Sequence, residues 1–197
     1  MQPVKSPSAR DRILDATISC VDRSGLNGFA LEDVASEAGV ARATIYRQFP
    51  GGRVELIRAA VTREVAAFWT ELADTVRGHR DLESRLVVGI MAAHRRIAEF
   101  ELLQRLLASE PGDLLTVLHE SDQVVHTMMV GYLRRLLDRE VLRHGVDPDT
   151  AADYLARMLV SYIAGAGDWD LSDPARVRRL VRTQFLAGIV EDTSTRS

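Results

Sequence analysis

Apolar side chains recur every three or four residues along almost the whole chain, and this spacing constrains the fold more than any other feature of the sequence. Such a repeat places apolar side chains on one face of a helix, whereas a half-buried strand requires strict alternation. Between residues 54 and 76 one face stays apolar for about six helical turns. We find no convincing alternating segment and no internal repeat. The sequence therefore predicts an all-α fold.

Glycine and proline divide this pattern into about nine helices. Gly39 is a good residue to end a helix, and Pro50-Gly51-Gly52 ends the next one. Near the C-terminus, Asp173-Pro174 is typical of an N-cap followed by proline at the first helical position. The expected helices run over about 13–21, 31–38, 42–49, 54–76, 82–97, 102–108, 114–142, 150–164 and 174–189.

The composition predicts a globular cytoplasmic protein. With 197 residues, the chain can bury roughly 70% of its unfolded surface without a disulfide or a metal. Cys20 is the single cysteine, which excludes an intramolecular disulfide and suits a reducing compartment. No apolar run approaches the ~20 residues that span a bilayer, so we expect no membrane partner. The N-terminal segment MQPVKSPSARDR lacks the apolar stretch of a signal peptide.

The formal net charge of −3 argues against a nucleic-acid partner only until its distribution is considered. Residues 1–53 carry seven basic and six acidic side chains, whereas residues 54–197 carry 18 basic and 22 acidic ones. Between Glu37 and Glu55 the chain has three arginines and no acidic residue. A small basic surface on an otherwise acidic chain is therefore possible, although so small an asymmetry is more often an ordinary solvated face.

Two short helices, 31–38 and 42–49, are joined by a tight turn at Gly39 and follow a longer helix, which are the dimensions of a helix-turn-helix. Ala35 is small where the two helices approach each other. The outer face of the second helix offers guanidinium, amide, hydroxyl and phenol groups, the chemistry that a major-groove helix needs. The expected core is Leu31, Val34, Ala35, Val40, Ile45 and Phe49, which leaves Arg42, Ala43, Thr44, Tyr46, Arg47 and Gln48 outside.

The segment DVASEAGVARATIYRQF resembles the DNA-binding domain of the tetracycline-repressor (TetR) family, and the likeness extends over residues 12–56. The specific positions are Asp33-Val34-Ala35, Ala38-Gly39-Val40, Thr44-Ile45-Tyr46 and Phe49. The resemblance implies a DNA-binding domain with a short N-terminal arm in residues 1–53. It also implies a homodimer that binds a palindromic double-stranded DNA operator and usually represses transcription.

The resemblance also implies roles for individual residues. Arg42, Ala43 and Arg47 are the candidates for contacts to base edges, and bidentate arginine–guanine pairs are the commonest specific contact. The candidates for phosphate contacts are Thr44, Tyr46, Gln48 and Arg53, with Lys5 and Arg10 from the N-terminal arm. The chain departs from the family pattern in two places. Phe29-Ala30 stands where the family often has Thr or Ser, and Arg53 is the nearest cation to the position of a common lysine.

For residues 54–197 the resemblance implies a helical domain that dimerises and binds a small-molecule effector, expected to be largely apolar. The candidates for the dimer interface lie on the last two helices, and they are Tyr154, Met158, Tyr162, Val177, Leu180, Val181 and Phe185. These faces could instead pack on their own subunit. The pocket candidates are bulky or soft residues of the middle helices, although any single residue of this kind is more often core than pocket. They are Phe68, Trp69, Met91, His94, Phe100, Leu103, Leu107, Met128, Met129 and Tyr132.

Other chemistry is weakly indicated. The sequence has no HExxH or CxxC spacing, no phosphate loop and no nucleophile elbow. We therefore expect no catalytic residues, no metal site and no cofactor. The alternatives to a ligand-responsive regulator are a small helical enzyme, or an interaction module without sequence-specific DNA binding.

Overall fold

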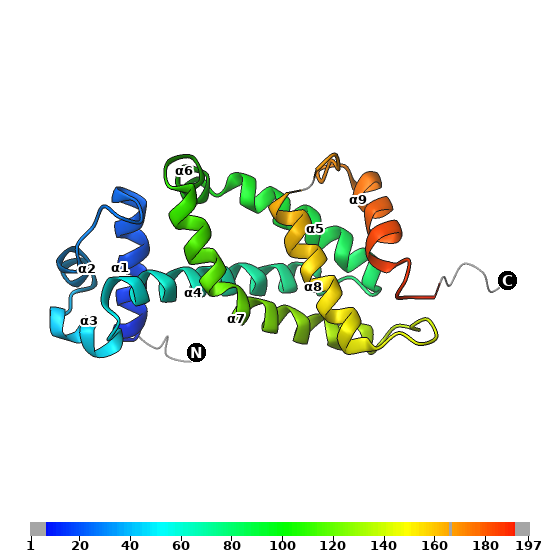
Figure 1. The fold of residues 1–197 in the computed structure, drawn as a ribbon, viewed down its shortest axis with the longest axis horizontal. Coiled ribbons are helices and arrows are strands. Elements are labelled where there is room, and N and C mark those ends of the chain that lie inside the picture. Colours follow the sequence, from blue (N-terminus) through cyan, green and yellow to red (C-terminus); the bar gives the residue numbers. More distant parts are fainter. Residues whose placement is uncertain (1–6, 166, 192–197) are drawn as a thin grey trace, which may run out of the picture. The chain divides into compact units, whose positions relative to one another are not determined.

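The computed structural model describes residues 7–165 and 167–191, and within them the chain is all-helical, as predicted (Figure 1). The only extended pairing there is an isolated antiparallel bridge between Leu142 and Val190. The helices are α1 (Ala9–Ser24), α2 (Leu31–Ala38), α3 (Arg42–Gln48), α4 (Gly52–Val76), α5 (Leu82–Glu99), α6 (Glu101–Ser109), α7 (Pro111–Leu137), α8 (Pro148–Ala164), α9 (Pro174–Leu180) and the π-helix η1 (Val181–Leu186).

Two of the differences from the predicted helix bounds are the most informative. α7 ends at Leu137 rather than Leu142, because Leu142 pairs with Val190 instead of continuing the helix. The last helix starts at Pro174 as expected, with Asp173 accepting hydrogen bonds from the amides of Ala175 and Arg176, but it widens into η1 after Leu180.

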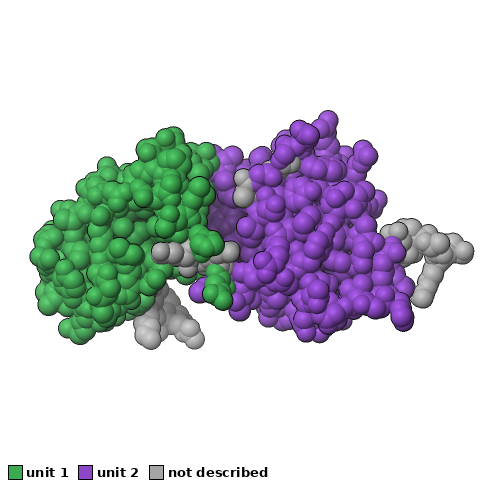
Figure 2. Space-filling model, in the orientation of Figure 1, with its two compact units in different colours: residues 1–66, 101–123 green, residues 67–100, 124–197 purple. Residues whose placement is uncertain are grey.

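The chain divides into two compact units, shown in different colours in Figure 2. Unit 1 comprises residues 1–66 and 101–123, and unit 2 comprises residues 67–100 and 124–197. The packing units therefore do not coincide with the domains expected from the sequence, because α4 and α7 each contribute to both. The functional boundary after residue 53 stays a prediction.

In unit 1, α1 packs against α2, and α3 follows α2 after a short turn. Their apolar faces form a core in which Ile13, Val34 and Ile45 are fully buried. Cys20 lies in this core, and its burial raises the pKa of the thiol. The cysteine is therefore a packing residue with little thiolate character.

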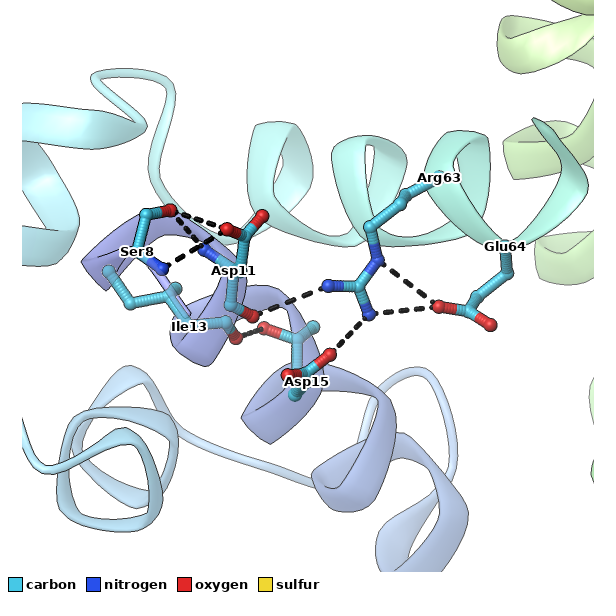
Figure 3. Close-up of polar contacts among 7 residues, drawn as sticks. Ser8, Asp11, Ile13, Asp15, Arg63 and Glu64 are labelled. Carbon is cyan, nitrogen blue, oxygen red and sulfur yellow. Dashed lines mark hydrogen bonds and ion pairs between the residues drawn. The ribbon is translucent and has the colours of Figure 1, made fainter. Parts of the chain in front are cut away.

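Polar contacts attach α4 to α1 within the same unit (Figure 3). Ser8 and Asp11 form a capping box at the start of α1, and this hydrogen bonding lowers the pKa of Asp11. Arg63 of α4 donates to the carbonyl oxygen of Asp11 at 3.3 Å and pairs with the Asp15 carboxylate at 2.8 Å. These bonds fix the face that α1 presents to α4.

Residues 101–123 belong to unit 1, where Leu106 and Leu114 join the core and acidic side chains accept hydrogen bonds from the loop after α1. Glu110 accepts from the backbone amide of Leu26 at 3.2 Å, and Asp113 accepts from the Asn27 side chain at 2.8 Å. Gly25 opens this loop with φ = 77°, and a Cβ there would lie 1.9 Å from the Glu110 carboxylate. The Glu110 side chain could move away from a Cβ, so it is the positive φ that favours glycine here.

In unit 2, α9 and η1 pack on α5, and this packing corrects one prediction. Four residues predicted for a dimer interface have exposed fractions of 0–1%, so they contribute to the core of their own chain: Val177, Leu180, Val181 and Phe185. Met158 and Tyr162 are partly buried, and the Tyr162 ring lies 5.4 Å from that of Phe185. Tyr154 is 40% exposed and donates a hydrogen bond to the Gln184 carbonyl at 2.6 Å.

None of the helices in the described ranges is both long and apolar enough to cross a membrane.

Candidate nucleic-acid interface and ligand cavity

The turn between α2 and α3 depends on Gly39. This residue adopts a left-handed conformation (φ = 63°, ψ = 42°), and the following amide, that of Val40, donates to the Ala35 carbonyl at 3.0 Å. Glycine adopts this conformation without the steric cost that a Cβ imposes. The turn is therefore the helix-turn-helix connection that the sequence predicts.

Burial on one side of α3 leaves its opposite side in solvent. Ile45 and Phe49, one turn apart, both have exposed fractions of 0% and anchor the helix on the core of unit 1. The side chains predicted to contact DNA are outside, as expected: Arg42, Ala43, Tyr46 and Arg47 are exposed, and Thr44 and Gln48 are half-buried. None of these six carries a negative charge.

Arg42 has a carboxylate partner that its own helix does not supply. Its guanidinium forms an ion pair with Glu32 of α2 and donates to the Tyr46 hydroxyl at 3.1 Å. The bond to Tyr46, together with the Glu32 charge, raises the pKa of Arg42, so the group stays positively charged. The sequence does not reveal Glu32 as a partner, because ten residues and a turn separate it from Arg42.

Arg47 differs from Arg42 in this respect. It is exposed, and no hydrogen bond or ion pair joins it to the described part of the chain. Its guanidinium therefore retains all its donors for another molecule.

The cations predicted for the N-terminal arm lie partly outside the described residues. Lys5 falls in residues 1–6 and is not described. Arg10 is exposed at the start of α1, donates to the Gln48 carbonyl at 3.3 Å and lies 4.4 Å from the centroid of the Phe49 ring. It therefore borders the C-terminal end of α3.

The two departures from the family pattern are in contact with each other. The Arg53 guanidinium lies 4.8 Å from the centroid of the Phe29 ring and donates to the Leu26 carbonyl. Phe29 is 93% buried, whereas Ala30 begins α2 without a side-chain cap, although the Asp33 carboxylate accepts from the Ala30 amide at 2.8 Å. These contacts favour a structural role for Arg53 over the phosphate role expected from the sequence.

We expect Arg53→Lys to destabilise unit 1 by about 0.5–2 kcal/mol, since lysine keeps the charge but loses the planar guanidinium over Phe29. Urea unfolding followed by circular dichroism measures this change, and Arg53→Met should cost a similar amount. A lysine variant that restores DNA affinity lost in the methionine variant would instead assign Arg53 to phosphate binding.

A cavity of about 430 Å³ lies within unit 2, between the second part of α4, α5, the second part of α7 and α8. Four of the ten predicted pocket residues line it: Trp69, Met128, Met129 and Tyr132.

The other six predicted pocket residues do not line this cavity, so their part in a ligand site stays a prediction. Phe100 and Leu107 are largely exposed, and Leu103 packs against the core of unit 1. Phe68 makes an edge-to-face contact with Trp69, while Met91 and His94 are half-buried on α5. Three cavity-lining arginines had no signal in the apolar pattern: Arg77, Arg85 and Arg135.

Among the residues that the structure describes, no group of three histidine, cysteine, aspartate or glutamate side chains could hold a metal ion.

Comparison with known proteins agrees with the geometry of unit 1. Residues 13–60 match the family model of the bacterial regulatory proteins, tetR family. The chain is 39% identical over 80 residues to the HTH-type transcriptional regulator AqdR of Rhodococcus erythropolis, and the aligned segment covers 41% of this chain and 38% of AqdR. It is 42% identical over 55 residues to the HTH-type transcriptional repressor KstR of Rhodococcus jostii, which covers 28% of this chain and 26% of KstR. The chain thus spans less than half the length of these two relatives.

A solved structure extends the likeness over both units. The complex of SmeT with triclosan matches with a TM-score of 0.58 and 27% identity, covering 95% of this chain and 94% of that one. SmeT is the repressor of the Stenotrophomonas maltophilia multidrug efflux pump SmeDEF, and a second SmeT structure also matches this chain. Over residues 13–60, the chain is thus similar to the TetR family of bacterial regulatory proteins. The named relatives are transcriptional regulators rather than enzymes, which agrees with the absence of a predicted catalytic site.

Proposed function

We propose that this protein is a DNA-binding transcriptional regulator, most simply a repressor, that places α3 in the major groove of its operator. The observation that carries the proposal is the exposed side of α3, where cationic and hydrogen-bonding side chains stand together without a carboxylate on the helix. A recognition helix in the major groove presents side chains of this kind to base edges. A regulator of this kind acts on chromosomal DNA, so the proposal includes a cytoplasmic location.

The exposed residues divide into two groups by chemistry. Arg47 and Arg42 have the donors for bidentate contacts to guanine, and Ala43 between them offers a methyl group to a neighbouring base. Thr44, Tyr46 and Gln48 would donate to phosphate oxygens, contacts that fix the register of the protein on the duplex. Arg10 would add a phosphate contact beside the end of α3.

The proposal includes a homodimer on a palindromic site. Two recognition helices separated by about 34–36 Å enter successive major grooves on one face of the duplex. In unit 2 the exposed Tyr154 and the half-buried Met158 of α8 provide an aromatic and apolar contact, which replaces the buried face of α9 as the candidate interface. A two-fold axis would bring this surface against its own copy.

The proposal also includes control by a small molecule. The SmeT structure contains triclosan, and the cavity in unit 2 of the present chain has the volume of a ligand pocket. A ligand that binds one spacing of the two recognition helices better than the other would change operator affinity by that difference.

The direct test is DNA binding by the purified full-length protein to the region upstream of its own gene. We expect sequence-specific binding that protects a palindromic site and weakens as the salt concentration rises. An unrelated duplex of equal length is the control. Equal affinity for both duplexes would overturn the proposal.

We expect Tyr46→Phe to weaken binding to every operator variant by a similar factor, roughly threefold to tenfold, since it removes one phosphate contact and no base contact. Fluorescence anisotropy with a set of single-base operator variants measures this. The fold should be unaffected, because Tyr46 is 42% exposed. A loss confined to one base position would assign Tyr46 to base recognition instead.

A further inference from the structure

The cavity in unit 2 is apolar along most of its wall. Its volume of about 430 Å³ falls within the usual range for small-molecule sites, about 300–1,000 Å³. Trp69 borders it from the middle of α4, and Met128 borders it from α7. The apolar lining is completed by Leu72, Ala73, Val76, Leu86, Gly89, Met129, Leu133, Leu136, Leu159 and Ile163.

The charged side chains of the wall gather at one end. Arg77 follows the last residue of α4, Arg85 lies in the first turn of α5, and Arg135 lies in the last turn of α7. A hydrogen bond from the Leu82 amide to Glu140 at 3.1 Å holds the start of α5 beside the segment that follows α7. The cavity is therefore amphipathic, because eight residues, or about 12 Å of helix, separate Trp69 from Arg77.

Positive charge exceeds negative charge at this end. Asp74 is the carboxylate of the wall, and it pairs with Arg77. Arg85 donates to the carbonyl oxygens of His79, at 2.7 Å, and of Arg77, which orient the guanidinium without cancelling its charge. Arg135 has no hydrogen bond or ion pair with any residue that the structure describes.

Tyr132 of α7 also lines the cavity. The Tyr132 hydroxyl is shielded from solvent and has no hydrogen-bond partner in the described chain. Leaving such a group unpaired is costly, so a shift of the Tyr132 side chain that lets a ligand oxygen reach the hydroxyl would be favourable. Tyr132 and Arg135 are three residues apart on α7, which places them side by side on the helix surface.

We propose that the effector of this protein is an anionic amphipathic molecule. Its apolar body would lie among the side chains between Trp69 and Leu159, and its negatively charged head group would bind Arg135 and Arg85 and accept a hydrogen bond from Tyr132. This inference rests on the proposed function only where it calls the ligand an effector. Binding of the ligand itself depends on unit 2 alone. It adds to that function the charge and the polarity of the ligand.

The test uses the full-length protein with Trp169→Phe, so that Trp69 is the remaining tryptophan and reports directly on the cavity. The probes are dodecanoate, the uncharged dodecanol and the cationic dodecyltrimethylammonium, all below the concentrations at which they form micelles. We expect dodecanoate to change Trp69 fluorescence at a concentration at least tenfold lower than dodecanol requires. Equal affinities, or a preference for the cation, would overturn the inference.

Two variants locate the head group. We expect Arg135→Gln to weaken dodecanoate binding about tenfold and to leave dodecanol binding unchanged, since one charge-assisted contact is lost. Tyr132→Phe should weaken dodecanoate binding severalfold. Arg95→Gln, an exposed arginine of α5 outside the cavity, is the matched control and should change neither. An Arg135→Gln variant that binds dodecanoate like the control would show that this arginine serves only the end of α7.

The DNA-binding experiment separates this inference from the proposed function. Operator binding together with no response of Trp69 to any probe would overturn the ligand class and leave the regulator intact. A dodecanoate response of the expected selectivity without operator binding would support the cavity and overturn the regulator. Thermal unfolding of each variant shows that a lost response is not a lost fold.

Discussion

Arg47→Ala should lower the preference for the correct base pair at one operator position by about 1–3 kcal/mol, with a smaller effect on other sequences. Arg47 is exposed on α3 and has no partner in the described part of the chain, so its guanidinium is available to a base. Arg42 starts from a different state, because its ion pair with Glu32 has to be exchanged for a base contact. We therefore expect Arg42→Ala to cost less than Arg47→Ala.

Competition binding with a full set of single-base operator variants measures these differences. Arg95→Ala removes an equal charge from α5 and serves as the control. If Arg47→Ala weakens binding to all sequences alike, Arg47 contacts phosphate and the assignment to a base is wrong. In a homodimer each half-site is read by one Arg47. Changing the base pair in both half-sites should therefore cost twice the binding free energy of changing it in one.

Phe49→Ala should destabilise unit 1 by about 3–5 kcal/mol, the usual cost of truncating a buried phenylalanine. The Phe49 side chain has an exposed fraction of 0%, its amide donates to the Ile45 carbonyl at 2.8 Å, and Arg10 packs over its ring. Its loss would leave a cavity where α3 is anchored. α3 has only seven residues, so it depends on this packing for its stability.

Hydrogen exchange of the α1–α3 amides, together with urea unfolding, measures the loss. Phe100→Ala is the matched control, since Phe100 is 46% exposed and its truncation should change stability by no more than about 0.5 kcal/mol. Equal stabilities of the two variants would contradict the anchoring role of Phe49. The predicted loss of operator affinity in Phe49→Ala should exceed that of any single variant on the exposed face of α3.

The local elements were predictable because their signals lie within a few residues of each other. Gly39 ends α2 where the sequence predicts, and the apolar positions of α2 and α3 are the buried ones. The error at the end of α7 has a tertiary cause, since the bridge from Leu142 to Val190 joins segments 48 positions apart. No local pattern carries that information.

The candidate sites divide in the same way. The exposed face of α3 follows from helical periodicity alone: Arg42, Ala43, Tyr46 and Arg47 are exposed, and Thr44 and Gln48 are half-buried. The dimer surface does not follow from helical periodicity. An apolar stripe shows that one face of a helix is buried, but it does not show which part of the molecule covers that face. Val177 and Phe185 are covered by their own chain. The sequence likewise predicts Leu103 for a pocket, and the structure packs it on the core of unit 1.

By itself, the sequence determined the helices, the helix-turn-helix and the chemistry of its outer face, since these depend on periodicity, capping and residue type over short distances. Only the tertiary structure decided which charges are already paired and where the cavity lies. The Arg42–Glu32 pair, the Arg53–Phe29 contact and the arginines at one end of the cavity all join residues from different elements. Through-space contacts of this kind depend on how helices pack, and helix packing is a property of the whole core rather than of any one segment.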